Sequence, residues 1–153
     1  MENPVNLVEE VRFLVETRKI RVIGISIIVG LIVIYSLGLI VASNNVNKDM
    51  AILNLISVIA APILCISSIY LRKARLKSVN KDNFKNTFAG VYIISFFLCD
   101  LGGIFAIVTN LFINYNLVYA TFGMIVAGVY VILNFPKRSD LDIINNRSKT
   151  IPV

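Results

Sequence analysis

Long uncharged stretches separate short polar segments along this chain. Four stretches contain almost no charged residue: 22–43, 50–71, 88–113 and 115–135. A helix needs about 20 mostly apolar residues to cross the ~30 Å hydrocarbon core of a membrane, and each stretch is long enough. The pattern therefore predicts an all-α integral membrane protein in which four transmembrane helices form a single membrane domain.

The polar segments predict how these spans are connected. The short segments 43–49 and 114–116 are typical of tight turns on the outer side, so the spans form two hairpins. A basic loop at 72–86 joins the hairpins on the inner side. Pro136 ends the fourth span because proline cannot continue a helix, and a polar cytoplasmic tail follows at 137–153.

The segment before the first span has a helical pattern of its own. Asn3 suits an N-cap, and Pro4 suits the first helical turn. Apolar residues then recur at helical spacing, opposite a charged face: Leu7, Val8, Val11, Leu14 and Val15. We expect an amphipathic helix over 4–19 on the cytoplasmic membrane surface or against a partner, with a bend at 18–21 before the first span.

Composition and charge distribution support a membrane protein with a defined orientation. Of the 153 residues, 57% are hydrophobic and 16% charged, against about 45–50% and about 25% in soluble domains. Every Lys and Arg except Lys48 lies before the first span, in the 72–86 loop or after the fourth span. Basic residues in short loops mark the cytoplasmic side, so we expect both termini there.

The net charge of +6 follows from this topology. It indicates anionic lipid head groups as partners, beside the lipid bilayer itself, and does not require nucleic acid. Frequent Asn, Lys and Ile suggest an AT-rich microbial genome. We therefore expect the protein in the cytoplasmic membrane of a prokaryote.

The sequence offers few groups for catalysis. It contains no His, which removes Ser/His/Asp and Cys/His catalytic sets and the common metal sites, and it has no Gly-rich phosphate-binding loop. Cys65 and Cys99 lie about 9 Å and about 17 Å from the inner ends of their spans, an offset that disfavours a disulfide. We expect no enzyme, metal or cofactor, and we expect the cysteines to be packing residues.

Small residues spaced four apart indicate close helix packing, because they let helix backbones approach in lipid. The pairs are Ser26 with Gly30, Gly38 with Ala42, Cys99 with Gly103, Gly102 with Ala106, and Gly123 with Ala127. Packing within the bundle explains them better than an interface between copies. Pro62, inside the second span, predicts a helix kink.

One carboxyl stands alone in the third apolar stretch. Asp100 lies about 18 Å from the inner end of its span, where an acid costs about 2.5–3.5 kcal/mol. No Lys or Arg lies within the four stretches, so desolvation favours the neutral carboxyl. Residues at similar depth offer hydroxyls to it: Tyr35, Ser57 and Thr121. Asp100 is then an interhelical contact, a contact to a partner subunit, or a binding site for H⁺ or Na⁺.

Residues 97–108, FLCDLGGIFAIV, resemble the carboxylate-bearing helix of rotary-ATPase proteolipids, the subunits that form membrane rings. In both, an acid is followed by small residues and an aliphatic–aromatic pair. The resemblance implies that Asp100 binds a transported H⁺ or Na⁺. Here the acid lies in the first helix of its hairpin, not the second, and neither 22–43 nor 50–71 carries the dense glycine repeat of the family.

Two functions remain open from these observations. The modest size, the amphipathic segment and the polar tail favour a small non-catalytic accessory or structural subunit of a larger membrane protein complex, packed against other subunits. The unpaired Asp100 favours an alternative, an ion-coupled membrane transport homo-oligomer that binds H⁺ or Na⁺ at this carboxyl.

Overall fold

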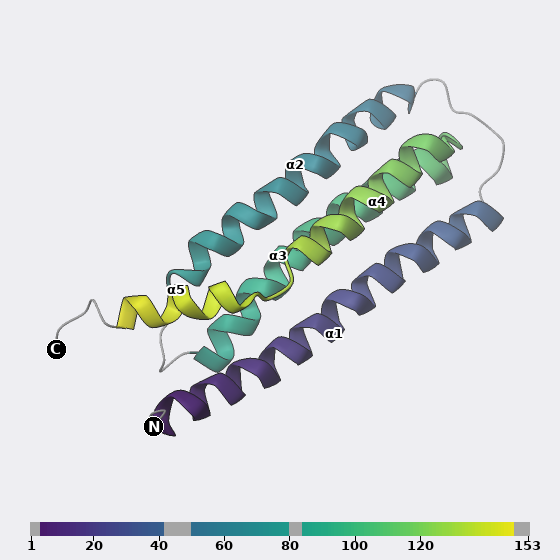
Figure 1. The fold of residues 1–153 in the computed structure, drawn as a ribbon. Helices are drawn as coiled ribbons and strands as arrows, with labels where there is room; N and C mark the ends of the chain where they lie inside the picture. Colours follow the sequence, from purple (N-terminus) through teal and green to yellow (C-terminus); the bar gives the residue numbers. More distant parts are fainter. Residues whose placement is uncertain (1–3, 42–49, 80–83, 149–153) are drawn as a thin grey trace.

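The computed structural model describes residues 4–41, 50–79 and 84–148, and the regular elements in these ranges are all helices (Figure 1). They are α1 (Pro4–Val41), α2 (Ala51–Leu76), α3 (Phe84–Ile107), the π-helix η2 (Val108–Ile113), α4 (Leu117–Leu133) and α5 (Arg138–Ser148). The predicted all-α class is confirmed for this part of the chain.

Three helical segments are long and apolar enough to cross a membrane: Glu10–Val41, Ile52–Leu76 and Thr87–Ile113. The last of these combines α3 with η2. The fourth apolar helix, α4, has 17 residues. Helices of this length and composition indicate a membrane protein in contact with the lipid bilayer.

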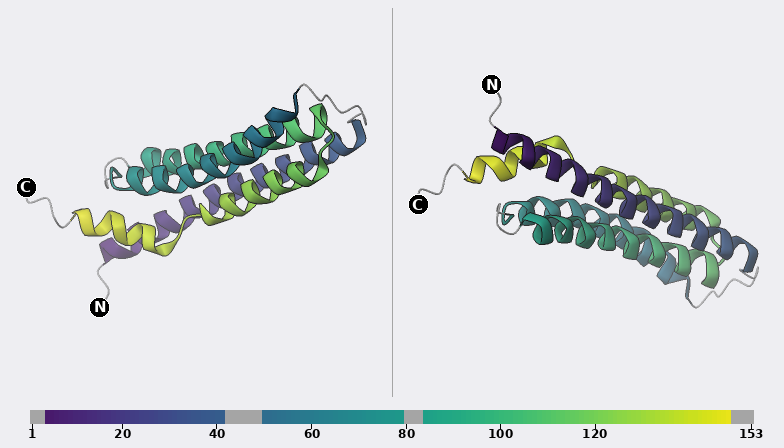
Figure 2. Two further views of the ribbon diagram at one scale, coloured as in Figure 1. Left: turned by 90° about the horizontal axis from the view of Figure 1, so that it is seen from above. Right: turned by 90° about the horizontal axis from the view of Figure 1, so that it is seen from below.

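α1 differs from the predicted arrangement of the N-terminal part. The segments 4–19 and 22–43 were expected as two helices, but residues 4–41 form one continuous helix of 38 residues, without the bend predicted at 18–21. Figure 2 shows its first turns extending beside α5. The reason is local: the junction contains no Gly or Pro, and its Arg and Lys residues favour the helix.

α5 also departs from the sequence-based prediction, which treated 137–153 as a polar tail. Its first turn is held by a side-chain cap, because Asp140 Oδ2 accepts the backbone N–H of Lys137 at 2.9 Å. An acid three residues after the N-cap commonly satisfies a backbone donor in this way. The tail therefore begins as an ordered helix of 11 residues.

α3 is the central helix of the bundle. It contacts α1, α2 and α4, whereas α1 and α2 lie on opposite sides of the α3–α4 pair (Figure 1). The predicted second hairpin, α3 with α4, is packed together. The predicted first hairpin is not, because α1 and α2 each pack on α3 and α4 instead of on each other.

A ladder of aromatic rings occupies the N-terminal half of α3. Phe84, Phe88, Tyr92 and Phe96 follow one another at four-residue spacing, and neighbouring ring centroids lie 4.8, 4.9 and 6.5 Å apart. Phe13 of α1 packs on Phe88 at 5.6 Å. Such pairs stabilise helix contacts beyond the area that they bury, and here they join the extended start of α1 to α3.

Small residues lie at several helix contacts. The contacts pair Gly102 with the backbone of Ala61, Gly103 with Ala127 and Leu31, Gly123 with Ala106, and Gly38 with Leu111 and Phe112; Cys99 is fully buried as well. Pro62 lies beside the Gly102 contact, inside a helix that is continuous on both sides of it. Whether it kinks α2 stays a prediction.

The Ser26–Gly30 pair does not take part in this packing. Ser26 is exposed and its hydroxyl bonds the carbonyl of Val22 four residues back, and a side chain at Gly30 would meet no atom within 4 Å. The prediction of packing within the bundle is wrong for this pair, because α1 turns its other face toward α3 and α4. Ala42 lies outside the described residues.

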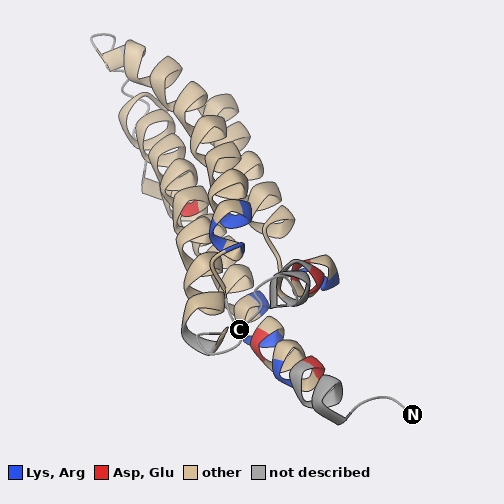
Figure 3. Cartoon of the chain, turned by 90° about the vertical axis from the view of Figure 1, so that its left-hand side faces the viewer, with Lys and Arg blue, Asp and Glu red and all other residues tan. Residues whose placement is uncertain are grey.

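Charged residues gather at one end of the bundle, where both termini lie, and the described part of the opposite end carries none (Figure 3). The two ends therefore differ in chemistry.

Candidate functional site

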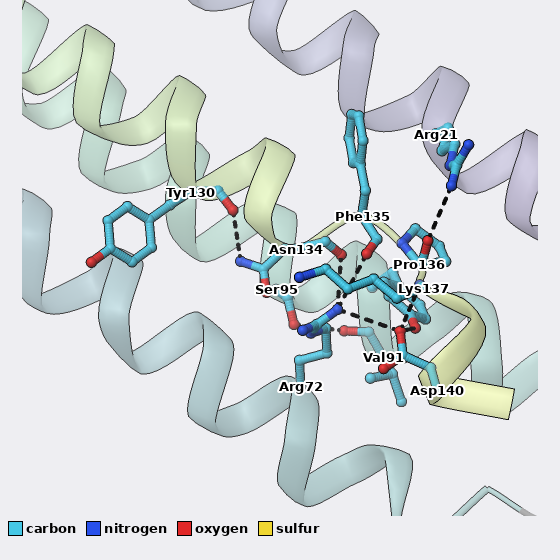
Figure 4. Close-up of polar contacts among 11 residues, drawn as sticks. Arg21, Arg72, Val91, Ser95, Tyr130, Asn134, Phe135, Pro136, Lys137 and Asp140 are labelled. Carbon is cyan, nitrogen blue, oxygen red and sulfur yellow. Dashed lines mark hydrogen bonds and ion pairs between the residues drawn. The ribbon is translucent and has the colours of Figure 1, made fainter. Parts of the chain in front are cut away.

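A buried ion pair lies at the charged end of the bundle (Figure 4). Arg72 Nη1 of α2 is 3.5 Å from Asp140 Oδ2 of α5, and the two side chains are only 5% and 7% exposed. Two charges removed from water are stable only if further polar groups surround them. The surroundings of both charges supply such groups.

Asp140 has two partners besides Arg72. The hydroxyl of Tyr92 donates to its Oδ2 at 2.7 Å, and the N–H of Lys137 donates to the same atom. Tyr92 belongs to the aromatic ladder of α3, so this hydrogen bond fixes α5 to the central helix.

Arg72 is also held by the end of α4. Its Nη1 donates to the carbonyl oxygens of Asn134 and Phe135 at 3.4 and 3.3 Å, and its guanidinium lies 5.8 Å from the ring centre of Tyr92. A cation is favoured at a helix C-terminus, where carbonyl groups lack helical partners. Arg72 therefore ties α2 to the turn between α4 and α5.

Deeper in the bundle, a second polar layer joins α2, α3 and α4. Asn134 Nδ2 donates to Ser68 Oγ at 2.7 Å and to the carbonyl of Tyr130 at 3.0 Å, and Ser68 Oγ lies 3.2 Å from Cys99 Sγ. Neutral amides and hydroxyls commonly join helices in lipid in this manner.

Both cysteines contact this layer, because Ser68 Oγ also donates to the carbonyl of Cys65 at 2.6 Å. Cys65 and Cys99 are free and buried. The predicted difference in their depth is wrong. Ser68 Oγ bonds the Cys65 carbonyl and lies 3.2 Å from Cys99 Sγ, so the two cysteines lie at the same level of the bundle.

A third polar layer lies toward the end of the bundle opposite the charged end. Asn110 Nδ2, on the π-helix η2, donates to Ser57 Oγ of α2 at 2.7 Å. One turn further, Asn114 Nδ2 donates to Asn54 Oδ1, also at 2.7 Å. π-Turns in helices often position particular side chains, and here η2 and the residue that follows it direct both amides toward α2.

Tyr35 and Thr121 form a separate contact between α1 and α4, with their hydroxyl oxygens 2.6 Å apart. Thr121 also donates to the carbonyl of Leu117, so Tyr35 supplies the proton of the shared bond. Of the three hydroxyls predicted to surround Asp100, two thus bond each other and the third, on Ser57, bonds Asn110.

Asp100 itself lies between these layers, at the centre of the span Thr87–Ile113. It is half-buried, and in the described ranges its carboxylate has neither a hydrogen-bond nor an ion-pair partner. Phe96 packs on Gly24, and Gly103 packs on Leu31, so the intervening Asp100 lies beside α1 near the level of Ile28.

This register explains why the predicted partners are absent. Gly38 of α1 packs on Leu111 of η2, so Tyr35 lies about two helical turns, or about 10 Å, further from the charged end than Asp100 does. The sequence-based prediction counted depth along each span separately, so it missed this offset between α1 and α3. Phe97 and Leu101 are exposed on the face of α3 that points away from the other helices. The half-buried Asp100 lies at the edge of this exposed face.

The residues that the sequence did not single out are mainly amides. Asn110, Asn114 and Asn134 are buried, and the Oδ1 atom of each has no partner among the described residues. The sequence signal for these residues was an uncharged amide inside or at the end of an apolar stretch, where it commonly bonds a neighbouring helix. The pairing of Arg72 with Asp140 had no such signal, because it joins segments 68 positions apart.

No group of three or more Cys, Asp or Glu side chains in the described part of the chain is arranged to hold a metal ion. Comparison with models of protein families, with curated proteins and with solved structures finds no match for this chain. The arrangement of its own residues therefore carries the argument on function.

Proposed function

We propose that the chain spans a prokaryotic cytoplasmic membrane four times, with both termini in the cytoplasm. For the fourth span, the 17 residues of α4 correspond to about 25 Å, at the lower end of the ~17–25 residues that cross a membrane. The orientation is supported by the basic residues, which gather at the end that holds both termini (Figure 3), as expected on the cytoplasmic side.

Labelling of single introduced cysteines with a membrane-impermeant maleimide tests this orientation. We expect Lys48→Cys to react on intact cells and Lys77→Cys to react only after the cells are opened. The unmodified chain measures the background, because Cys65 and Cys99 are buried. Reaction of Lys77→Cys on intact cells would contradict the proposed orientation.

We propose further that the protein is a small non-catalytic subunit of a larger membrane protein complex. The observation that carries this proposal is Asp100, an acid at mid-span that has no partner among the described residues and lies next to the exposed face of α3 formed by Phe97 and Leu101. A carboxyl at this depth costs about 2.5–3.5 kcal/mol, and the described residues offer nothing to offset that cost. A basic or hydrogen-bonding group on a neighbouring membrane helix would offset it.

Native mass spectrometry of the protein extracted from its own membrane in mild detergent tests the subunit proposal. We expect a different polypeptide to be present in a fixed ratio, and we expect Asp100→Leu to abolish its retention. Asp142→Leu removes an exposed acid on α5 and serves as the matched control. A monomer without any partner polypeptide would refute the proposal.

An ion-coupled homo-oligomer is the second candidate, favoured by the same mid-span position of Asp100. In this case the Asp100 carboxylate would bind H⁺, or Na⁺ in its place, and release it again, and the local resemblance of 97–108 to rotary-ATPase proteolipids points the same way. A hydrophobic carbodiimide should then label Asp100 more strongly at low pH, and Na⁺ should protect it if Na⁺ is the ion. Labelling that is absent at every pH would exclude this role.

A further inference from the structure

A groove with a volume of about 1100 Å³ runs between α1 and the α4–α5 turn at the charged end of the bundle. One face of α1 forms its longer wall, from Glu10 to Ile25, and Pro136 and Leu141 lie on the opposite wall. Buried side chains of Phe13 and Thr17 also line it. A space of this size is comparable to the ~300–1,000 Å³ of small-molecule sites.

The chemistry of the groove changes along α1. Val22 and Ile25 form an apolar end that is 58% and 53% exposed and lies within the membrane-spanning part of α1. Arg18, Lys19 and Arg21 follow toward the N-terminus. The groove thus joins a surface suited to hydrocarbon to a surface suited to an anion.

The positive charge of the groove is only partly neutralised. Four basic residues and one acidic residue line it. Lys19 is paired with Glu16 at 2.9 Å and Arg138 with Glu10 at 2.7 Å.

The other two basic residues retain their charge. Arg21 Nη2 donates to the carbonyl of Pro136 at 3.3 Å (Figure 4), and its guanidinium has no ion-pair partner among the described residues. Arg18 has no ion-pair partner in the ranges that the structure describes. Two guanidinium groups on the same helix face are therefore available to an anion.

A hydroxyl in the groove is also unpartnered. The Oγ1 atom of Thr17 is buried without a hydrogen-bond partner among the described residues. A threonine hydroxyl inside a helix usually bonds a carbonyl three or four residues back. Thr109 and Thr121 of this chain do so, with Phe105 and Leu117. Thr17 departs from this pattern about one turn from Arg21, where a ligand oxygen would accept a hydrogen bond from its hydroxyl.

We infer that the groove binds one anionic glycerophospholipid. Arg18, Arg21 and the Thr17 hydroxyl bind the headgroup phosphate, and an acyl chain lies along Val22 and Ile25. This inference rests on the proposed membrane placement, in which residues 18–21 lie at the inner membrane surface. An acidic peptide would use the guanidinium groups but would leave the apolar end uncovered, and the apolar end is what favours a lipid.

Native mass spectrometry of the purified full-length protein in detergent tests the inference with two probes, palmitoyl-oleoyl phosphatidylglycerol and the corresponding phosphatidylcholine. We expect one phosphatidylglycerol per chain to be retained under conditions that remove phosphatidylcholine. The variant with Arg18→Gln and Arg21→Gln should bind phosphatidylglycerol about thirtyfold more weakly. This equals about 2 kcal/mol, from about 1 kcal/mol for each basic residue near an anionic lipid surface.

The controls separate a built site from general attraction. Lys73→Gln with Arg75→Gln removes the same charge from exposed positions of α2 outside the groove and should leave binding unchanged. Thr17→Val should weaken binding about fivefold, and Thr17→Ser should retain it. Arg18→Gln alone changes a side chain without an ion pair in the described part, so its loss of binding cannot be assigned to misfolding.

Several outcomes would overturn the inference. These are equal retention of the two lipids, equal loss in the groove variant and the α2 control, or equally tight binding of free glycerol phosphate, which lacks acyl chains. The lipid-binding inference and the proposed orientation are tested independently, because lipid binding in detergent does not depend on which side of the membrane the groove faces. If phosphatidylglycerol does not bind while the maleimide labelling comes out as expected, the lipid site is refuted and the proposed orientation stands.

Discussion

Removing the carboxylate of Asp140 is the sharpest test of what holds the charged end of the bundle together. Asp140→Ala deletes the acceptor of three contacts, from Arg72, Tyr92 and the N–H of Lys137. It leaves the Arg72 guanidinium buried without a counter-charge. Asp140→Asn keeps an acceptor oxygen for Tyr92 and Lys137 but removes the charge.

The expected magnitude follows from these contacts. Removing one partner of a buried ion pair costs about 3–5 kcal/mol. Arg72 would retain two carbonyl acceptors, on Asn134 and Phe135, so we expect about 3 kcal/mol for Asp140→Ala and about 2 kcal/mol for Asp140→Asn. Replacing both charges, with Arg72→Met and Asp140→Leu together, should bring the free energy of unfolding back to within about 1 kcal/mol of the original protein.

Reversible unfolding in mixed detergent micelles, followed by helical circular dichroism, measures these differences. Limited trypsin digestion adds a local readout, because cleavage after Lys137 and Arg138 should become faster once α5 is released. Asp142→Ala, an exposed acid on the same helix, should change neither. Arg72→Met and Asp140→Leu are also measured one at a time. If their separate effects on the free energy of unfolding add up in the double variant, the two side chains are not coupled and the reasoning is refuted.

Three further predictions concern the polar and small residues of the spans. Gly102→Ala places a methyl group 3.2 Å from the carbonyl oxygen of Ala61 and should lower the free energy of unfolding by about 1–3 kcal/mol. Gly128→Ala has open space around it and should be neutral or stabilising. Equal effects of the two changes in the same unfolding assay would contradict the packing. A double-mutant cycle of Asn110→Leu and Ser57→Ala should give a coupling of about 0.6–1.7 kcal/mol, and a coupling of zero would mean that the hydrogen bond contributes nothing. Asp100→Leu should leave the unfolding of the isolated chain unchanged or make it harder, since the carboxylate has no partner in the described part; a loss above 1 kcal/mol would show that a contact within the chain was missed.

The sequence predicted the positions of the apolar helices well, because hydrophobic length is a property of each segment alone. The segments 50–71 and 115–135 correspond to α2 and α4 within a few residues. Asn116, between η2 and α4, caps α4 by accepting the N–H of Tyr119 at 3.2 Å, a local signal of the kind that sequence patterns carry.

What the sequence did not predict depends on how helices are offset against one another. Asp100 was matched with Tyr35 by counting depth, but the register of Gly38 on Leu111 moves Tyr35 away from it. The continuity of α1 was missed for a different reason. Amphipathic and apolar patterns predict two environments, and a single helix can pass through both when no residue interrupts it.

The distribution of polar partners gives Asp100 its significance. At the charged end, Asp140 and Arg72 are bonded to each other and to neighbouring helices; near the other end, the Asn110 amide donates to Ser57. Each of these groups joins helices, so each stabilises the fold. The one carboxyl at mid-span makes no such contact, although a charge is more costly there than an amide is. The contacts among the described residues therefore give no folding reason for an acid at this position, which is why we propose that another subunit or an ion binds beside α1 and α3.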